Sequence, residues 1–343
     1  MKANVDDTLR PRGGSVLVLG SGVSRSRGLP MWDELARRLW DSAFPERSSP
    51  WDEYSGNRSP RDVPQFLPIV FELALRHMGQ ARFTRGLRAA LYESARFPAY
   101  DPNFAHSQES LAVIARLVGR EFDRQGRRRI DSIVTLNADD LLEQAISVCQ
   151  PRKRKRWVGK LVRVYSRSIG RLQGPPGLIP IPIYHIHGFV PANRDGLYGL
   201  GPHGAWNSKY PRFFDHNLVF TDLQYWATTA APHAFSNRVM TWCLNERRCL
   251  FIGLSMTDIN VLRWLALLRQ ERDRDALEVM RFSDRGFLRE RGLSATTHIW
   301  LRAEGDDPTG FLSEFFATRG VKAVTFKSWE GPHFSRLIER AFP

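Results

Sequence analysis

The stretch Ser15–Ser24, SVLVLGSGVS, joins a short apolar run rich in β-branched residues to a loop with two glycines. The run Ser15–Leu19 predicts a buried strand, because it is continuous, short and followed by a turn signal. Further on, Leu35 and Leu39 are four residues apart and follow Pro30, which predicts a helix with the proline at or before its first turn. A buried strand, a glycine loop and a helix are the start of a doubly wound α/β domain.

The rest of the chain continues to alternate between strand and helix patterns. We expect strands at Ile130–Leu136, Leu161–Tyr165, Ile179–Ile186, Leu218–Phe220, Arg248–Ile252, His298–Leu301 and Val321–Phe326. We expect helices at Gln65–Tyr92, Ser107–Val118, Gly310–Ala317 and His333–Ala341, and helix starts near Asn137, Thr221 and Asp258. Residues 41–64 predict a loop, and residues 41–125 as a whole predict a mainly helical insertion. Residues 189–217, rich in glycine, proline and aromatics, predict a long irregular loop beside the functional site.

The charge of the chain is strongly positive. The 50 lysines and arginines exceed the 36 acidic residues, which gives a net charge of +14 and a pI of about 10.2. Such a surplus favours anionic partners such as nucleic acid, nucleotides or acidic protein surfaces. The dense basic segment 151–171 has no acidic residue and could contact nucleic acid or an acidic partner. Two alternatives stay open: the segment is a solvated face, and the scattered arginines reflect composition alone.

The cysteines and the N-terminus limit the class of protein. The three cysteines, Cys149, Cys243 and Cys249, form no C-x-x-C pair, so we expect no four-cysteine zinc site and no secreted disulfide framework. Residues 1–12 are polar and lack an apolar signal segment. No apolar run approaches the roughly 18 residues that a transmembrane helix needs. We therefore expect a cytoplasmic protein without a membrane segment.

Four motifs follow predicted strands in one order. They are GSGVS at Gly20–Ser24 with GLPMW at Gly28–Trp32, TLNADD at Thr135–Asp140, HIHG at His185–Gly188 and FIGLSMTD at Phe251–Asp258. Together they resemble the sirtuin-like domain of bacterial proteins, a relative of the sirtuin deacylases. The segment LVFTDLQYW, Leu218–Trp226, also resembles that bacterial branch. The resemblance extends from Ser15 to about Phe326, so we expect residues 1–343 to form one sirtuin-like NAD-binding domain.

The resemblance implies a Rossmann-like parallel sheet with helices on both faces, and NAD as the bound nucleotide. Ligands of open parallel sheets bind beyond the carboxyl ends of the strands, where all four motifs lie. Glycines 20 and 22 and Ser21 would let the backbone approach a pyrophosphate. The alternative is a tight strand-to-helix turn with no ligand.

Asn137 and His187 are the expected catalytic residues, because they match the strand-end asparagine and the His-Gly histidine of the family. An amide both donates and accepts, so Asn137 could hold a ribose and a water together. A neutral imidazole could accept a hydroxyl proton, which is the role expected for His187. We expect His185 to point away from this site and to be structural. Asp139 would orient the network or cap the following helix.

The remaining expected nucleotide contacts follow from the same resemblance. Gly188 permits the chain to turn next to His187, and a GxS…D loop would contact the far side of the nucleotide. These contacts are Gly188, Gly253, Ser255 and Asp258, with Ser24 and Trp32 toward the nicotinamide. Each has a plain alternative: a strand-end turn, a helix cap or, for Trp32, the core.

The chain departs from the deacylases in two ways. It lacks their four-cysteine zinc module, and Pro30 is followed by Met31-Trp32-Asp33 where they have Asp-Phe-Arg. We therefore expect an NAD glycohydrolase that releases nicotinamide and ADP-ribose, with NAD as substrate and no zinc. Two other functions stay open: a protein deacylase or ADP-ribosyltransferase, and a non-catalytic subunit that binds NAD, ADP-ribose or nucleic acid.

The resemblance also suggests a biological setting. Bacterial proteins similar to this chain deplete NAD as effectors of antiphage defence, and stand-alone types pair with a HerA-like ring ATPase. We expect no separate sensor domain, because sheet motifs occupy most of the chain. Control would then come from such a partner or from a homo-oligomer.

Overall fold

The computed structural model describes residues 14–51, 66–124, 128–149, 162–165, 180–192, 218–282 and 298–342, with only the backbone at 162–165 and 275–282. Its strands are β1 (Ser15–Leu19), β2 (Ile130–Thr135), β3 (Val162–Tyr165), β4 (Ile181–His185), β5 (Arg248–Ile252), β6 (His298–Ala303) and β7 (Val321–Phe326). Its α-helices are α2 (Trp32–Ala43), α4 (Phe66–Met78), α5 (Gln80–Tyr92), α6 (Ser110–Asp123), α7 (Leu141–Cys149), α9 (Asp222–Ala230), α10 (Phe235–Glu246), α11 (Ile259–Phe282), α13 (Phe311–Thr318) and α14 (His333–Ala341).

The strands form one parallel sheet in the order β3-β4-β2-β1-β5-β6-β7. Without the edge strand β3, this order corresponds to the 3-2-1-4-5-6 order of dinucleotide-binding sheets. From β1 the chain adds β2, then β3 at the edge, and then β4 between β2 and β3. It then crosses over to place β5 on the other side of β1. The predicted α/β class with a Rossmann-like parallel sheet is confirmed, and the order changes direction between β1 and β5.

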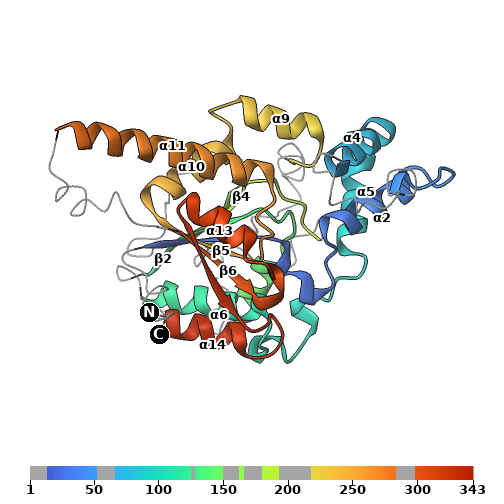
Figure 1. Cartoon of the computed structure of the whole chain (residues 1–343). Helices are drawn as coiled ribbons and strands as arrows, with labels where there is room; N and C mark the ends of the chain where they lie inside the picture. The colour runs from blue at the N-terminus through green and yellow to red at the C-terminus, as the bar shows by residue number, and fades with distance from the viewer. Residues whose placement is uncertain are drawn as a thin grey trace.

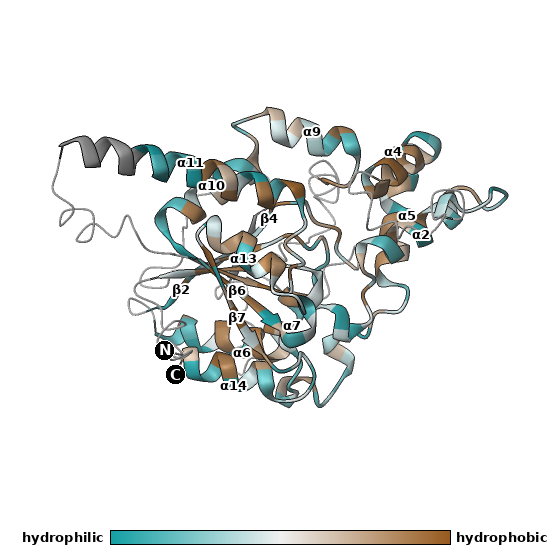
Figure 2. Ribbon diagram, viewed as in Figure 1, coloured by the Kyte–Doolittle hydropathy of each residue, from teal (hydrophilic) through white to brown (hydrophobic). Residues whose placement is uncertain are grey.

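Helices cover both faces of the sheet (Figure 1). In β1, Leu17 and Leu19 face one core with α6, α7 and α14, whereas Val16 and Val18 face a second core with α10, α11 and α13. Figure 2 shows apolar residues along the strands and on the inward sides of these helices. Burial of the central strands on both faces explains why β1 and β5 are almost continuously apolar.

Helices α2, α4 and α5 pack against one another beside the sheet, while α6 lies under it (Figure 1). The sequence predicted one helical segment over Gln65–Tyr92, but the structure has two helices separated by Gly79. Gly79 has a φ of 71°, a left-handed conformation that interrupts a helix and favours glycine. Whether residues 41–125 form an insertion of their own stays a prediction.

One predicted strand is wrong. Leu218–Phe220 is a loop, because its amides serve other partners: Val219 donates to the His187 carbonyl (3.0 Å) and Phe220 to Gln224 Oε1 (2.9 Å). The helix start expected at Thr221 is confirmed, with Thr221 and Gln224 in a capping box at the start of α9. Most of residues 151–171 and 189–217 lies outside the described residues, although β3 confirms the strand expected near Leu161–Tyr165.

Candidate functional site

The four strand-end motifs meet at one edge of the sheet. They follow β4, β2, β1 and β5, which are adjacent in that order. The last residues of these strands pair in register: Leu19 lies opposite Thr135 and Ile252, and Thr135 lies opposite His185. The loops that the sequence assigns to a common site therefore begin at the same level of the sheet.

The glycines at this edge allow two loops of the protein to touch. A Cβ added at Gly20 would lie 2.6 Å from the carbonyl oxygen of Gly253, and one at Gly22 would lie 2.8 Å from the same oxygen. Gly253 has a φ of 66°, which also favours glycine. The loops after β1 and β5 thus pack backbone against backbone where the strand order changes direction. These contacts alone require the glycines, whether or not a nucleotide binds.

The backbone amides of the first loop are mostly occupied by protein. Four of the five from Gly20 to Ser24 donate to backbone carbonyls, and within the described residues only the amide of Ser21 does not. The loop continues as two short 3-10 turns, Ser21–Val23 and Arg25–Arg27, and α2 begins only at Trp32. A pyrophosphate here would meet the Ser21 amide, not the row of free N–H groups that an α-helix N-terminus offers.

The two serines of this loop differ in their surroundings. Ser24 is buried, and its Oγ lies 3.5 Å from Asp139 Oδ1 and 3.4 Å from Asn137 Nδ2. Ser21 Oγ is half-buried and contacts Met31 Sδ at 3.7 Å. Ser24 therefore links the first loop to the second, whereas Ser21 makes only a weak side-chain contact.

Trp32 is half-buried in an aromatic cluster. Its ring centroid lies 5.4 Å from that of Phe71, 5.1 Å from Phe220 and 6.4 Å from Tyr225. Phe71 belongs to α4 and Tyr225 to α9, so Trp32 packs between the helices beside the sheet and the segment that follows β4. Trp32 packs against the core and also contacts Tyr225, a neighbour of His187, while its place at the nicotinamide end of the site stays a prediction.

Asn137 is held by three hydrogen bonds besides the one from its Nδ2 to Ser24 Oγ. Its amide N–H donates to Thr135 Oγ1 (3.0 Å), and its Nδ2 donates to the Gly20 carbonyl (3.1 Å). Its own carbonyl accepts a hydrogen bond from His185 Nδ1 at 2.9 Å. Within the described part of the chain its Oδ1 has no partner. The carboxamide is therefore fixed in orientation, with its acceptor oxygen available to a ligand.

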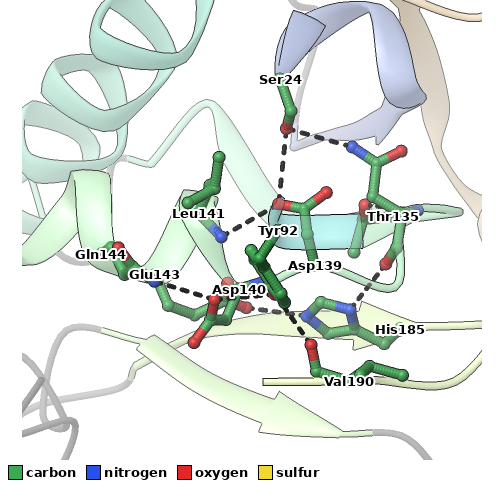
Figure 3. Close-up of polar contacts among 11 residues, drawn as sticks. Ser24, Tyr92, Thr135, Asp139, Asp140, Leu141, Glu143, Gln144, His185 and Val190 are labelled. Carbon is green, nitrogen blue, oxygen red and sulfur yellow. Dashed lines mark hydrogen bonds and ion pairs between the residues drawn. The ribbon is translucent and has the colours of Figure 1, made fainter. Parts of the chain in front are cut away.

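Two buried aspartates follow Asn137 (Figure 3). Asp139 Oδ1 accepts from the Leu141 amide (3.0 Å), which confirms that Asp139 caps α7. Asp140 Oδ1 accepts from Tyr92 Oη (2.9 Å) and Gln144 Nε2 (2.8 Å). Burial raises the pKa of Asp139 to about 6 and, together with the nearby Glu143, raises that of Asp140 to about 7. Both carboxyls are therefore partly protonated near neutral pH.

His185 and Glu143 form a buried pair (Figure 3), and His185 also contacts the backbone carbonyl of Asn137. The His185 Nε2 lies 2.8 Å from Glu143 Oε1, and both side chains are almost fully buried. Burial lowers the pKa of His185, but the Glu143 carboxylate and the Asn137 carbonyl outweigh burial and raise it above its ordinary value. Both ring nitrogens face acceptors, so His185 donates from both as an imidazolium beside a carboxylate.

His187 has different neighbours from His185. A continuous strand would place the two on the same face, but β4 ends at His185 and the chain turns through Ile186 and His187. Because of that turn, the side chains of His185 and His187 contact different parts of the protein, as expected. His187 is only 1% exposed, and within the described residues neither ring nitrogen has a hydrogen-bond partner. Burial lowers its pKa, so His187 is a neutral imidazole at pH 7.

Asp258 and Tyr225 are the polar groups next to His187. Asp258 Oδ2 lies 3.9 Å from His187 Nε2 and accepts a hydrogen bond from Tyr225 Oη at 3.2 Å. Its Oδ1 caps α11 by accepting from the amides of Asn260 (2.9 Å) and Val261 (3.1 Å). The Tyr225 ring centroid is 5.7 Å from that of His187. Asp258 thus has contacts with protein on both oxygens, next to the histidine.

Residues 131–299 match the family model of the SIR2-like domain. The match supports a sirtuin-like domain with an NAD-related function. It includes TLNADD, HIHG and FIGLSMTD, whereas GSGVS lies before it. A search of curated proteins finds no match to the chain.

Two turns shape the candidate site near His187. Gly188 has a φ of 87°, and the His187 carbonyl accepts from the Val219 amide, which ties the turn to the segment before α9. After β5, Ser255 is exposed and its Oγ lies 2.7 Å from Thr257 Oγ1. Between these two, the buried Met256 has a φ of 61°, a conformation rare outside glycine. The β5 loop is therefore strained at the functional edge, where such strain is commonly found.

Three residues of the site gave no distinct signal in the sequence. Tyr92 is at the end of α5, far from the motifs along the chain, and only the fold brings it to Asp140 and to the Val190 carbonyl (2.8 Å). Glu143 lies within α7, where an acidic residue in a first helical turn is ordinary. Tyr225 lies in the segment LVFTDLQYW that the sequence singled out, but nothing marked its hydroxyl.

The described residues hold neither a candidate metal site nor a candidate membrane span. They contain no group of three or more His, Cys, Asp or Glu side chains arranged to hold a metal ion. Among the same residues, no helix is both long and apolar enough to cross a membrane. The basic segment 151–171, apart from the backbone of 162–165, lies outside them.

Proposed function

We propose that this protein is an NAD glycohydrolase that cleaves the bond between nicotinamide and ribose. One observation carries the proposal: His187 is buried, neutral and without a hydrogen-bond partner among the described residues, at the carboxyl edge of the sheet. Buried imidazole nitrogens are normally hydrogen-bonded, so two free ones point to a ligand that completes the site. The match to the SIR2-like domain supports NAD as that ligand.

The residues at the sheet edge fit a dinucleotide in part. The free acceptor oxygen of Asn137 and the free nitrogens of His187 suit ribose hydroxyls and a water, because both residues follow register-paired positions on β2 and β4. Among the described residues, the Ser21 amide is the one amide of the Gly20–Ser24 loop without a backbone acceptor, so it would meet the pyrophosphate alone. The ribose end of the site therefore supports NAD more strongly than the phosphate end.

The proposed reaction is hydrolysis through an oxocarbenium-like state, as in glycoside cleavage. The C–N bond to nicotinamide breaks, and its electron pair neutralises the pyridinium nitrogen of the leaving group. A water oxygen bonds to the same ribose carbon and gives ADP-ribose. Asn137 orients the ribose and the water through its Oδ1, and His187 accepts the proton that the water or a ribose hydroxyl loses.

Purified protein incubated with NAD provides the test, with and without the product of the neighbouring gene. We expect nicotinamide and ADP-ribose to accumulate under at least one condition. Asn137→Ala and His187→Ala should each lower the rate by about 100-fold or more, the size of effect typical of general acid–base groups. Asn245→Ala and His233→Ala, at exposed positions on or before α10, are matched controls that should keep full activity.

Three outcomes would contradict hydrolysis. Intact NAD under both conditions would exclude it, and NAD binding without turnover would instead favour a non-catalytic binding subunit. Transfer of ADP-ribose to protein, or loss of acyl groups from lysine, would appear in mass spectra of candidate targets and favour a transferase or deacylase. The absent four-cysteine module and the Met31-Trp32-Asp33 sequence count against acyl-lysine recognition.

We further propose that the enzyme is a cytoplasmic antiphage effector that depletes NAD, controlled by a homo-oligomer or by a HerA-like ring ATPase. The support is the resemblance of the four motifs to bacterial defence proteins, and the basic segment 151–171 would suit a partner that handles DNA. Co-purification from the native operon and plaque counts with His187→Ala test this role. A monomer that binds no partner and leaves plaque counts unchanged would contradict it.

A further inference from the structure

The carboxylate of Asp258 stands between two groups that compete for it. Its Oδ2 accepts a hydrogen bond from Tyr225 Oη at 3.2 Å and lies 3.9 Å from His187 Nε2, which is beyond hydrogen-bond distance. Its Oδ1 is occupied by the amides at the start of α11. The oxygen that faces His187 is therefore shared with a tyrosine and not used to cap the helix.

We infer that Asp258 is a positioning residue that serves as counter-ion to His187 when His187 takes up a proton, and that Tyr225 sets how strongly the two interact. The inference rests on the proposed function, in which His187 accepts the proton released by water or a ribose hydroxyl. It differs from the nucleotide contact that the family resemblance implies for Asp258.

A counter-ion is needed because His187 is buried. An imidazolium taken out of water is costly unless an anion is close by, and among the described residues Asp258 is the acidic side chain that lies within 4 Å of the ring. Burial lowers the pKa of His187, and Asp258 partly offsets that effect. His187 therefore starts neutral, as a proton acceptor must, while the protonated form is stabilised at the moment it forms.

The other polar neighbours limit how the pair behaves. Tyr225 on α9 remains protonated, since burial raises its pKa well above the ordinary value and the Asp258 charge raises it further. Arg263 on α11 also interacts with Asp258, but its guanidinium donates to the Thr229 carbonyl (2.8 Å) and to Asn237 Oδ1. Tyr225 is thus the group that directly occupies the oxygen facing His187.

Two substitutions separate this role from helix capping. Asp258→Asn keeps an Oδ1 that can cap α11 but removes the charge. Tyr225→Phe keeps the ring beside His187 and Trp32 but releases Oδ2. Asp307→Asn is the matched control, because Asp307 accepts from the amides of Leu312 and Ser313 at the start of α13, on a different loop.

The measurement is the pKa of His187 in the full chain by NMR titration, with His187→Gln used to assign its signal. We expect Asp258→Asn to lower this pKa by about one or more, because an opposite charge at this distance has effects of that size. Tyr225→Phe should raise it, and Asp307→Asn should leave it unchanged. In NAD hydrolysis, Asp258→Asn should lower kcat about 10- to 100-fold near neutral pH with little change in KM.

The outcomes are distinguishable from those of the proposed function. If the pKa of His187 is the same in wild type and Asp258→Asn, or falls in Tyr225→Phe, the inference is wrong whatever the activity. If wild type never consumes NAD but the titration shifts as expected, the pair exists and only the proposed reaction fails. Tyr225→Phe does not touch the cap, so it decides the question even if Asp258→Asn does not fold.

Discussion

His185 donates its Nδ1 hydrogen to the backbone carbonyl of Asn137 across 2.9 Å, which ties the end of β4 to the loop after β2. The other ring nitrogen is fixed by Glu143 at 2.8 Å. His185 therefore has the structural role expected of it, because it holds the backbone of Asn137, the residue proposed to orient the ribose. A buried, doubly donating imidazolium is a rigid support because any rotation would break a bond to each side.

Glu143→Gln should destabilise the protein. The substitution leaves His185 without its carboxylate at a fully buried position, and loss of one partner of a buried pair costs about 3 kcal/mol. Urea unfolding monitored by circular dichroism measures the change. Glu72→Gln removes an exposed pair with Arg76 and should cost less than about 1 kcal/mol. Equal losses of unfolding free energy for the two variants would show that the buried pair stabilises the protein no more than the Glu72–Arg76 pair does.

The contribution of Asp140 to folding stability should fall as the pH rises from about 4 to about 7. The pKa of Asp140 is raised to about 7 in the folded protein, so the folded state binds more protons than the unfolded state over this range. Stability present below the unfolded pKa is then lost as the pH approaches 7, at about 1.4 kcal/mol per pH unit for one full proton. Asp139 acts in the same direction between about pH 4 and 6, and His185 does so above its unfolded pKa of about 6.5. Burial lowers the pKa values of His187 and His298, so these two histidines act in the opposite direction below about pH 6.5.

Asp140→Asn should remove this contribution, so that the unfolding free energy falls less, or rises more, between about pH 4 and 7 than in wild type. The variant loses one titrating group and keeps an acceptor for Tyr92 and Gln144. Unfolding free energies at several pH values between 4 and 8 provide the measurement. Asp41→Asn, at an exposed position of α2, should keep the wild-type slope. A slope that is unchanged in Asp140→Asn would mean that this carboxyl is already ionised in the folded protein at low pH.

Tyr92→Phe should cost about 1 to 3 kcal/mol of stability. The hydroxyl accepts from the Asp140 amide (3.0 Å) and lies within hydrogen-bond distance of the Asp140 carboxyl and the Val190 carbonyl, so its loss leaves buried groups unpaired. Tyr100→Phe is the matched control, because Tyr100 is 76% exposed. Differential scanning calorimetry compares the two, and a Tm equal to wild type in Tyr92→Phe would rule out this link between α5 and the site.

Gly22→Ala should destabilise the protein and disturb the site together. The added methyl would lie 2.8 Å from the Gly253 carbonyl oxygen and 2.9 Å from its Cα, and overpacking against backbone costs about 1 to 3 kcal/mol. Gly305→Ala meets no atom within 4 Å and should be nearly neutral. The measurement is the Tm of Gly22→Ala and of Gly305→Ala, each compared with that of wild type. A stable Gly22→Ala that only loses NAD binding would instead show that the glycine serves the nucleotide.

Much of the fold follows from local sequence. The continuous apolar runs predict parallel strands buried on both faces, and glycines mark several ends, with Gly20 after β1, Gly79 after α4 and Gly253 after β5. The errors have local causes of their own. Gly79 divides a helical pattern that has continuous apolar spacing, and Leu218–Phe220 has strand-like residues whose amides are taken by His187 and Gln224.

By itself, the sequence determined the α/β class and the positions of the strand-end motifs, because both depend on periodicity and on residue type along the chain. The choice of Asn137 and His187 as proposed catalytic residues came from the resemblance of those motifs to the sirtuin-like family. Only the tertiary structure decided that the glycines pack against one another, that Asp258 faces His187, and that Tyr92 and Glu143 belong to the site. Burial and the pairing of distant groups set the charge of each side chain, and both arise only when the strands align.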